Sequence, residues 1–248
     1  MRRAIAFLTP LGPSVAPTST TFGWFPLVGA AIGLIVGGVW WAADRAWSPM
    51  AAAAVTVIAD IAVTGYLHLD GLADSADGLL PPLSRSRRLE VMRDPTVGAF
   101  GAVTVMAVLL VRFGALASTP AVPLVVAALW CGSRTSMVAI ARTLTYARPE
   151  GGLVTSFVPP ATSGSARPPI RRWSAGAILT VLAGLALALV LAVVGDRIRG
   201  LEAVGAEAAA VAGVAWFAHC RIGGFTGDVL GAAGVVGETV GLLVLAAR

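Results

Sequence analysis

Long apolar stretches alternate with polar connections along the whole chain. A membrane-spanning helix needs about 20 mainly apolar residues, and seven stretches approach that length. They are residues 24–42, 50–67, 97–117, 122–141, 174–195, 203–220 and 229–247. This pattern predicts an all-α fold: a polytopic integral membrane bundle of about seven transmembrane helices, with residues 1–248 forming a single domain.

The composition supports a membrane protein. Of 248 residues, 57% are hydrophobic and only 12% are charged, and the mean hydropathy is +0.84. Soluble domains carry about 25% charged residues, so this chain cannot cover itself with a polar surface. A soluble enzyme is excluded and a lipid bilayer is the expected surrounding. The net charge of +5 comes from Arg scattered between apolar stretches, so no nucleic acid partner is expected.

Two connections are long and polar, at residues 68–96 and 142–173. Cytoplasmic segments of membrane proteins are enriched in basic residues. If the N-terminus lies in the cytoplasm, twelve of the 18 Arg lie on the cytoplasmic side and four on the opposite side. We therefore expect a multi-pass protein of the cell (inner) membrane whose two long connections face the cytoplasm.

The densest group of acids directly follows the second apolar stretch, in HLDGLADSADG at 68–78. Asp70, Asp74 and Asp77 are spaced i, i+4 and i+7, which puts them within about 60° of one another on a helix. Their charges repel unless a cation lies among them, and carboxylate oxygens suit a hard ion such as Mg²⁺ that bridges to phosphates. The three are the candidate metal ligands. His68 lies on the opposite side of this helix and is not assigned to the metal.

A glycine-rich turn, RIGGFTGD at 221–228, precedes the last apolar stretch. Glycines let the main chain approach a ligand closely, and successive N–H groups can bind phosphate. Arg221 adds a fork of donors for phosphate oxygens. Asp228 is a candidate for a further metal ligand or the general base, and a plain turn between two spans is the alternative.

Arg93 lies with Asp94 at the mouth of the third span, and we interpret it as a phosphate contact. Three charges lie deeper. Asp60, Arg134 and Glu238 are each about 10–14 Å from the cytoplasmic end of their spans at 1.5 Å per residue, so we expect Arg134 to pair with Asp60 or Glu238. These three could equally serve only to hold helices together. Arg112 is nearer the outer end of its span and is expected to extend its side chain to the membrane surface.

Together these groups predict a membrane-embedded enzyme that carries out phosphoryl transfer at a cytoplasmic, metal-dependent site. The candidate catalytic residues are Asp228, Arg93 and Arg221. The candidate substrate-binding residues are Arg134, Asp94, Gly223, Gly224, Thr226 and Gly227. The oligomeric state is not determined by the sequence, and a homo-oligomer is compatible with it.

At these same positions the chain resembles the cobalamin synthase family of adenosylcobinamide-GDP ribazoletransferases. The blocks that carry the resemblance are FPLVG at 25–29, HLDGLAD at 68–74 with Asp77-Gly78, Arg93-Asp94 with Gly98 and Phe100-Gly101, Ala147-Arg148 with Gly151, and Gly223-Gly224 with TGD at 226–228 and LGA at 230–232. Two positions depart from the family pattern. Pro10 stands where Arg is common, and Val235 stands where an acid is common, which puts any role of those positions in doubt.

The resemblance implies a reaction. A ribose hydroxyl of α-ribazole, or of its 5′-phosphate, attacks the phosphorus linked to cobinamide in adenosylcobinamide-GDP. GMP leaves, and the nucleotide loop of adenosylcobalamin (or its 5′-phosphate) is completed, which is the last stage of cobalamin (vitamin B12) assembly. The resemblance further implies Mg²⁺ held by Asp70, Asp74 and Asp77, a second metal or the hydroxyl proton at Asp228, and charge stabilisation by Arg93 and Arg221.

Three other classes of membrane protein share part of this pattern. A CDP-alcohol phosphatidyltransferase also has an Asp-rich helix at a membrane face, although Asp74 directly after Ala73 departs from its usual motif. A UbiA-like prenyltransferase binds a diphosphate through Asp-rich motifs, but the glycine-rich block at 223–228 is not a second such motif. A transporter would explain the intramembrane charges, yet we find no paired repeats.

Overall fold

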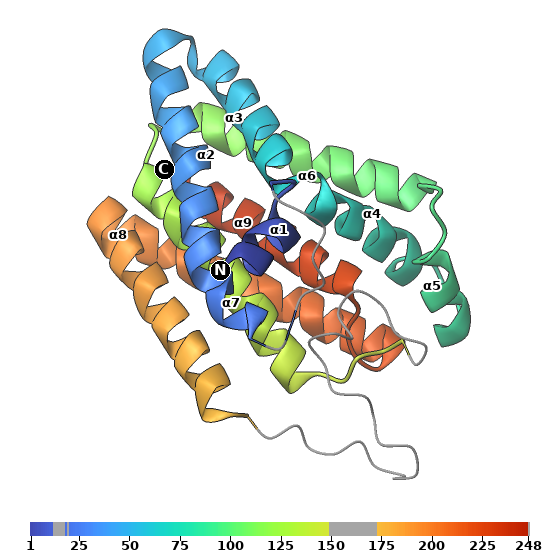
Figure 1. Ribbon diagram of the computed structural model, residues 1–248. Coiled ribbons are helices and arrows are strands. Elements are labelled where there is room, and N and C mark those ends of the chain that lie inside the picture. Colours follow the sequence, from blue (N-terminus) through green and yellow to red (C-terminus); the bar gives the residue numbers. More distant parts are fainter. Residues whose placement is uncertain (12–17, 19, 149–172, 248) are drawn as a thin grey trace.

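The computed structural model describes residues 1–11, 18, 20–148 and 173–247, and it forms a bundle of helices (Figure 1). The helices are α1 (Arg2–Leu8), the 3₁₀ helix η1 (Thr21–Trp24), α2 (Phe25–Ala46), α3 (Pro49–Thr64), α4 (Leu67–Leu79), α5 (Arg85–Val91), α6 (Ala99–Ser118), α7 (Pro123–Thr143), α8 (Ala175–Ile222) and α9 (Gly227–Leu245). The prediction of an all-α membrane bundle is confirmed.

Among the described residues, five helical segments are long and apolar enough to cross a bilayer: η1 with α2, and then α6, α7, α8 and α9. The bent pair of α3 and α4 forms a sixth candidate. The 48 residues of α8 contain a break at Asp196, where the backbone leaves helical geometry. When the two limbs of α8 are counted separately, each of the seven predicted stretches has its own helix or helix limb.

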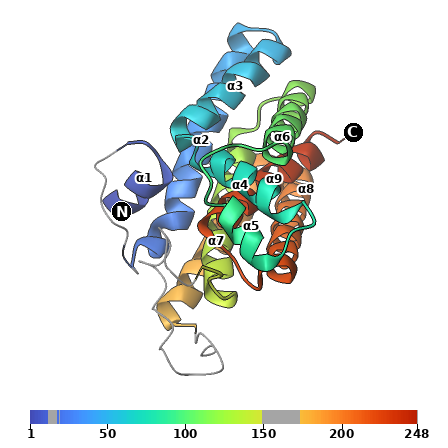
Figure 2. The ribbon, with the colours of Figure 1, turned by 90° about the vertical axis from the view of Figure 1, so that its right-hand side faces the viewer.

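The second predicted span is shorter than expected. It ends at Thr64, so the 16 residues of α3 cover only about 24 Å at 1.5 Å per residue. Gly65 and Tyr66 both adopt left-handed backbone conformations, and α4 leaves at 90° to α3. The bend lays the Asp-rich block alongside α6 and α9, and the connection at 68–96 contains helices α4 and α5 (Figure 2).

The break in α8 reverses the chain tightly. A Cβ built on Gly200 would lie 2.3 Å from the carbonyl oxygen of Ala192, so the start of the second limb touches the end of the first. Figure 1 shows the two limbs running in different directions from this corner. They account for the predicted fifth and sixth spans.

Helix α7 forms the centre of the bundle. Of the residues in its most apolar segment 83% are buried, whereas the value is 22% for α6 and for α8. Gly29, Gly33 and Gly37 form a stripe on α2 that faces it. A Cβ on any of these three would lie 2.4–2.7 Å from a main-chain atom of α7. Such small residues let helix backbones approach closely in a membrane, and they fix α2 against the core.

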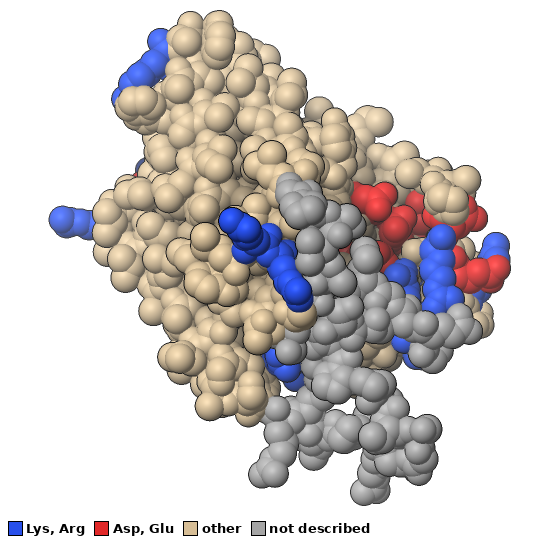
Figure 3. Space-filling model, viewed as in Figure 1, with Lys and Arg blue, Asp and Glu red and all other residues tan. Residues whose placement is uncertain are grey.

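The acids visible in Figure 3 concentrate at one side of the molecule, near α4 and α5, with Arg beside them. Other Arg in this view are scattered, and most of the remaining surface is uncharged. By contrast, α6 and the first limb of α8 expose large apolar side chains such as Val103, Leu110, Leu182 and Val194. A bilayer would cover those surfaces and leave the charged side in water.

Candidate active site

The predicted acidic block is helical, and its three acids have different surroundings. Along α4, Asp70 is exposed, Asp74 is half-buried and Asp77 is buried. Asp74 lies within electrostatic range of Asp70, Asp77 and Asp228, so several negative charges converge here. The prediction that the acids share one helix is confirmed, whereas their exposure, and so their access to a ligand, differs.

Two glycines bring the last helix against this block. A Cβ on Gly71 would lie 2.9 Å from the carbonyl oxygen of Asp228, and one on Gly231 would lie 3.3 Å from the Cα of His68. Without side chains at these positions, α4 and the first turn of α9 come into contact. The acid at 228 therefore joins the acids at 70 and 74, although more than 150 residues separate them in the chain.

Asp228 is held by an arginine that the sequence reasoning left out of the site. The Arg148 Nη2 donates to the Asp228 carboxylate at 2.5 Å and to the carbonyl oxygen of Met92 at 3.0 Å. The Thr226 hydroxyl donates to the same carboxylate at 3.1 Å and accepts from the N–H of Val229, so it also caps α9. Arg148 belongs to one of the family blocks, which was the signal that could have identified it.

A short parallel bridge places Arg148 beside the glycine-rich turn. The N–H of Phe225 donates to Thr145 at 2.9 Å, and the N–H of Ala147 donates to Phe225 at 2.8 Å. A Cβ on Gly224 would lie only 1.9 Å from the carbonyl oxygen of Thr145, so this pairing requires glycine there. Residues 145–147 and 224–226 thus form one unit at the mouth of the site.

Asp77 uses its two oxygens to bind the start of α6. One oxygen accepts from the N–H of Gly98 at 2.7 Å and the other from the N–H of Gly101 at 2.9 Å. A Cβ at either glycine would lie within 2.5 Å of the carboxylate. A carboxylate at a helix N-terminus is stabilised by the unpaired N–H groups and the helix dipole. The metal role of Asp77 stays a prediction, while its contact with α6 is a feature of the fold.

A cavity lies between α4, α9 and the N-terminal helices and encloses about 770 Å³ of space, including its open mouth. Asp70, Asp228 and Arg148 line its polar side. Its other wall is largely aromatic, formed by Phe7, Phe22, Phe25 and Tyr146. Burial raises the pKa of the Tyr146 phenol, so that group stays neutral. The lining of the cavity therefore combines polar groups suited to phosphate and metal with apolar aromatic rings.

The donors fit a magnesium ion that also binds substrate. No hydrogen bond within the described part of the chain occupies the carboxylates of Asp70 and Asp74. In that same part, no three His, Cys, Asp or Glu side chains are already arranged around a metal position. Mg²⁺ commonly takes only one or two protein carboxylates and completes its shell with water and substrate phosphate oxygens. Asp70 and Asp74, with Asp228 opposite, fit that mode.

Of the other predicted site residues, Gly227 lines the cavity and the rest are not among its lining residues. Arg93 is exposed after α5, within electrostatic range of Tyr146. Asp94 accepts from the N–H and hydroxyl of Thr96, and these bonds lower the pKa of its carboxyl. Arg221 is exposed, with its guanidinium 4.9 Å from the ring centre of Phe217. Gly223 ends α8 in a left-handed conformation, and Gly227 lines the cavity.

Two further arginines of the run after α4 hold the site together. The Nε of Arg85 donates to the carbonyl oxygen of Ile222 at 2.8 Å, and its Nη2 donates to that of Ala147 at 3.3 Å, which joins α5 to the end of α8 and to one side of the bridge. The Nη1 of Arg88 donates to the carbonyl oxygens of Gly78 and Leu79, the otherwise unpaired end of α4. No signal in the sequence distinguished these from topology-setting arginines.

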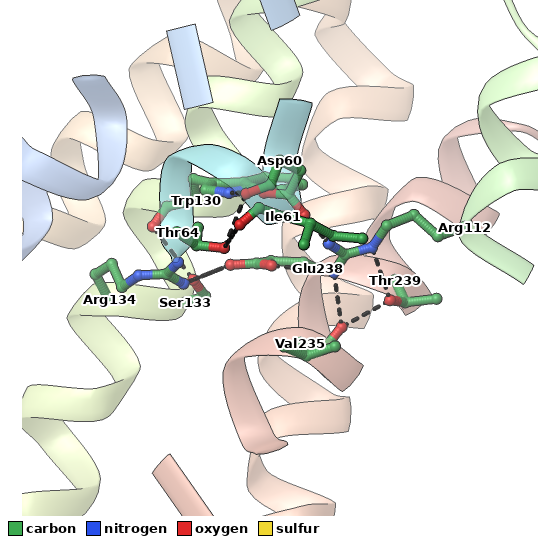
Figure 4. Close-up of polar contacts among 10 residues, drawn as sticks. All are labelled: Asp60, Ile61, Thr64, Arg112, Trp130, Ser133, Arg134, Val235, Glu238 and Thr239. Carbon is green, nitrogen blue, oxygen red and sulfur yellow. Dashed lines mark hydrogen bonds and ion pairs between the residues drawn. The ribbon is translucent and has the colours of Figure 1, made fainter. Parts of the chain in front are cut away.

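Arg134 and its neighbours form a buried ion network inside the bundle (Figure 4). Arg134 pairs with Glu238 at 2.5 Å, as predicted. Arg112 does not extend to the membrane surface: it is 2% exposed and pairs with Asp60 and with Glu238. Its position near the end of α6 suggested an escape to water, but α9 and α3 supply carboxylates on the inner side. Arg134 does not line the cavity.

Comparison with known proteins agrees with this arrangement. The family model described as cobalamin-5-phosphate synthase matches residues 1–246. An adenosylcobinamide-GDP ribazoletransferase of Chlorobium phaeovibrioides is 34% identical over 245 residues, which are 95% of this chain and 91% of the relative. Proteins of the same name from Chlorobaculum parvum and Azorhizobium caulinodans are 35% and 36% identical, covering 93% and 84% of this chain and 87% and 76% of the relatives. No solved structure matches. The extent of these matches shows that the chain belongs to the cobalamin-5-phosphate synthase family.

Proposed function

We propose that this protein joins adenosylcobinamide-GDP to α-ribazole, or to α-ribazole 5′-phosphate, and releases GMP. The family match over nearly the whole chain and the names of the relatives support this assignment. The observation that carries it at the site is the cavity in which Asp70, Asp228 and Arg148, all from family blocks, come together. The family match does not favour a CDP-alcohol phosphatidyltransferase or a UbiA-like enzyme.

In the proposed reaction the ribose hydroxyl oxygen forms a bond to the phosphorus that carries cobinamide. The bond from that phosphorus to the bridging oxygen breaks, and GMP leaves with the electron pair. Asp228 is the candidate acceptor of the hydroxyl proton, or a ligand of a second metal. Arg148 orients this carboxylate through its second bond to Met92.

Asp70 and Asp74 would hold Mg²⁺, which when bound neutralises charge on the diphosphate. Asp77 keeps its candidate metal role, and in addition it fixes α4 to α6. Arg93 and Arg221 are both exposed, and as candidate catalytic groups they would stabilise charge on the diphosphate. The aromatic wall formed by Phe7, Phe25 and Tyr146 would accept the flat base of a nucleotide substrate.

We further propose that the site faces the cytoplasm from the inner membrane. The Arg-rich segments at 85–93 and at 142–148 flank the site, and this is the sign of a cytoplasmic face. The apolar surfaces of α6 and α8 fit a bilayer.

The direct test incubates the purified protein in lipid vesicles with adenosylcobinamide-GDP and α-ribazole, with and without Mg²⁺, and measures released GMP. We expect GMP only with both substrates and Mg²⁺. Asp74→Asn should remove most of this activity, because a neutral amide is a poor ligand for Mg²⁺. Asp44→Asn, at the far end of α2, is the control and should keep it.

Absence of GMP from the unsubstituted protein would contradict the transferase assignment. Full activity of Asp74→Asn with unchanged Mg²⁺ dependence would contradict the metal assignment alone.

A further inference from the structure

Glu207, on the second limb of α8, is a buried acid with no partner. It is 1% exposed, and neither of its carboxylate oxygens has a hydrogen-bond partner within the described part of the chain. Asp60 and Glu238, which are also buried, each pair with a guanidinium. Glu207 thus differs from its neighbours in the same interior.

The ion network next to it is already balanced. Two guanidinium groups, of Arg112 and Arg134, face two carboxylates, of Asp60 and Glu238. An ionised Glu207 would add a third negative charge to a network whose two guanidinium groups already pair with other carboxylates. An isolated buried carboxylate is strongly unfavourable, and such a group takes up a proton instead.

Helices α7 and α9 enclose the Glu207 side chain tightly. A Cβ on Gly132 of α7 would lie 2.6 Å from Oε2, and one on Gly237 of α9 would lie 3.2 Å from Cγ. A slot that cannot hold an added methyl group on these sides does not accommodate a hydrated metal ion. A proton is the cation that needs no further space.

The charged and titratable groups that act on Glu207 come from both neighbouring helices. From α7 these are Arg134 and the Cys131 thiol, and from α9 it is Glu238. Of the three, only Arg134 is a cation, and its Nη1 already donates to Glu238 and to Ser133, each at 2.5 Å.

We propose that Glu207 is a proton-binding site in the interior of the bundle, and that the resting protein holds it as a neutral carboxylic acid. The proton keeps Glu207 from competing with Glu238 for Arg134. If the proton leaves, that competition breaks the balanced pairing between α7 and α9. This site is separate from the transferase cavity and does not depend on the proposed function.

Infrared spectroscopy of the full chain in lipid vesicles tests the proposal. A neutral carboxylic acid has its own C=O stretching band, which an ionised carboxylate lacks. In mildly alkaline buffer we expect this band in the unsubstituted protein, its loss in Glu207→Gln and its retention in Glu202→Gln, an exposed acid on the same helix limb. Melting temperatures should be similar for all three, because Gln replaces a group that is already neutral.

A second measurement covers the case in which Glu207→Gln does not fold. Biosynthetic labelling of glutamate with carbon-13 should shift the band in the unsubstituted protein, because the C=O of Glu207 then contains the heavier carbon. A band that comes from an aspartic acid would not shift. The proposal is wrong if the band is missing, if it persists unchanged in Glu207→Gln, or if the label does not move it. It is equally wrong if exchanging sodium for choline changes the band, since that outcome identifies a metal cation in place of the proton.

Discussion

Several glycines of the family blocks lie where any side chain would strike a neighbour. A Cβ would meet the main chain of Asp228 at Gly71, the carboxylate of Asp77 at Gly98 and Gly101, and the carbonyl oxygen of Thr145 at Gly224. The acids and Arg148 lie close together only because these glycines let their helices and turns touch. At the scale of single residues, the site therefore depends on missing side chains as much as on charged ones.

Replacing Gly224 by Ala should separate the glycine-rich turn from residues 145–147. The added carbon would lie 1.9 Å from a carbonyl oxygen, so the bridge that positions Arg148 must open. We expect GMP release to fall by more than about tenfold, as for other misplaced catalytic groups. Gly38→Ala, where a Cβ meets nothing within 4 Å, is the control and should keep its activity. Equal activity of the two variants would contradict this role of the bridge.

Arg148→Lys should show what the placement of the guanidinium contributes. Both bonds of Arg148 come from its Nη2. Lys keeps the positive charge but lacks the rigid, planar group that positions this donor, so Asp228 would lose its fixed orientation relative to Met92. We expect kcat to fall by about tenfold or more, with melting temperature little changed. The measurement is the initial rate of GMP release over a range of both substrates. A variant that changes only KM would show that Arg148 binds substrate and does not orient Asp228.

At the scale of helices, charged side chains join neighbouring helices through hydrogen bonds and ion pairs. Asp77 joins α4 to the N-terminus of α6, and Arg88 binds the C-terminal carbonyl groups of α4. The ion network joins α3, α6, α7 and α9. The contacts of Asp77 and Arg88 fix the C-terminal end of the short helix α4. Nearer its other end, Gly71 packs against Asp228 of α9.

Asp77→Asn should destabilise the contact between α4 and α6. An amide offers one acceptor oxygen and no charge to two N–H donors, and hydrogen bonds to charged groups contribute about 1.5–3 kcal/mol. We expect a lower melting temperature in detergent, whereas Asp74→Asn should melt like the unsubstituted protein. If Asp77→Asn melts normally and instead changes the Mg²⁺ dependence of GMP release, the main role of Asp77 is to bind the metal, and its contact with α6 contributes little to stability.

Removing Arg112 should be costly because it leaves Asp60 without its guanidinium. Breaking a buried ion pair from one side costs about 3–5 kcal/mol, so Arg112→Leu should unfold far more easily. The double variant Arg112→Leu with Asp60→Leu should recover part of that loss, and Arg45→Leu, an exposed arginine of α2, is the single-site control. Chemical or thermal unfolding in matched detergent measures all three. A double variant no better than Arg112→Leu would contradict the pairing.

At the scale of the whole molecule, apolar and charged surfaces are separated. The site, α5 and the bridge lie toward one side, whereas α6 and the first limb of α8 present apolar surface (Figures 1 and 3). A single orientation in the bilayer satisfies both. The oligomeric state stays open, and light scattering of the protein in detergent would determine it.

Thiol labelling in intact cells tests the orientation. In a Cys220→Ser background, which leaves only the buried Cys131, a cysteine in place of Ser86 of α5 should react with an impermeant reagent only after the membrane is opened. A cysteine in place of Ala46, at the C-terminal end of α2, should react while the membrane is intact. Both positions are exposed, so the difference reports the side of the membrane. The reverse pattern would place the site outside the cytoplasm.

Much of this protein follows from the order of its residues. Hydropathy alone predicted the seven helical stretches, because a bilayer demands long apolar helices. Helical spacing placed Asp70, Asp74 and Asp77 on one helix. Similar depth predicted that Arg134 pairs with Asp60 or Glu238, and Glu238 is the partner. These inferences succeeded because each depends on a local period or on a constraint that the membrane imposes.

Only the tertiary structure decided which groups meet across the chain. The 90° bend at Gly65–Tyr66 and the glycine contacts bring Asp228 to the α4 acids and Arg148 to Asp228. The sequence also did not show that Arg112 turns inward or that Glu207 lacks a hydrogen-bond partner, because the partners of a buried charge come from other helices. The sequence by itself determines the helical spacing of residues and the length of each apolar stretch that spans the bilayer. The distances between helices depend on how closely the helices pack, and only the tertiary structure determines that.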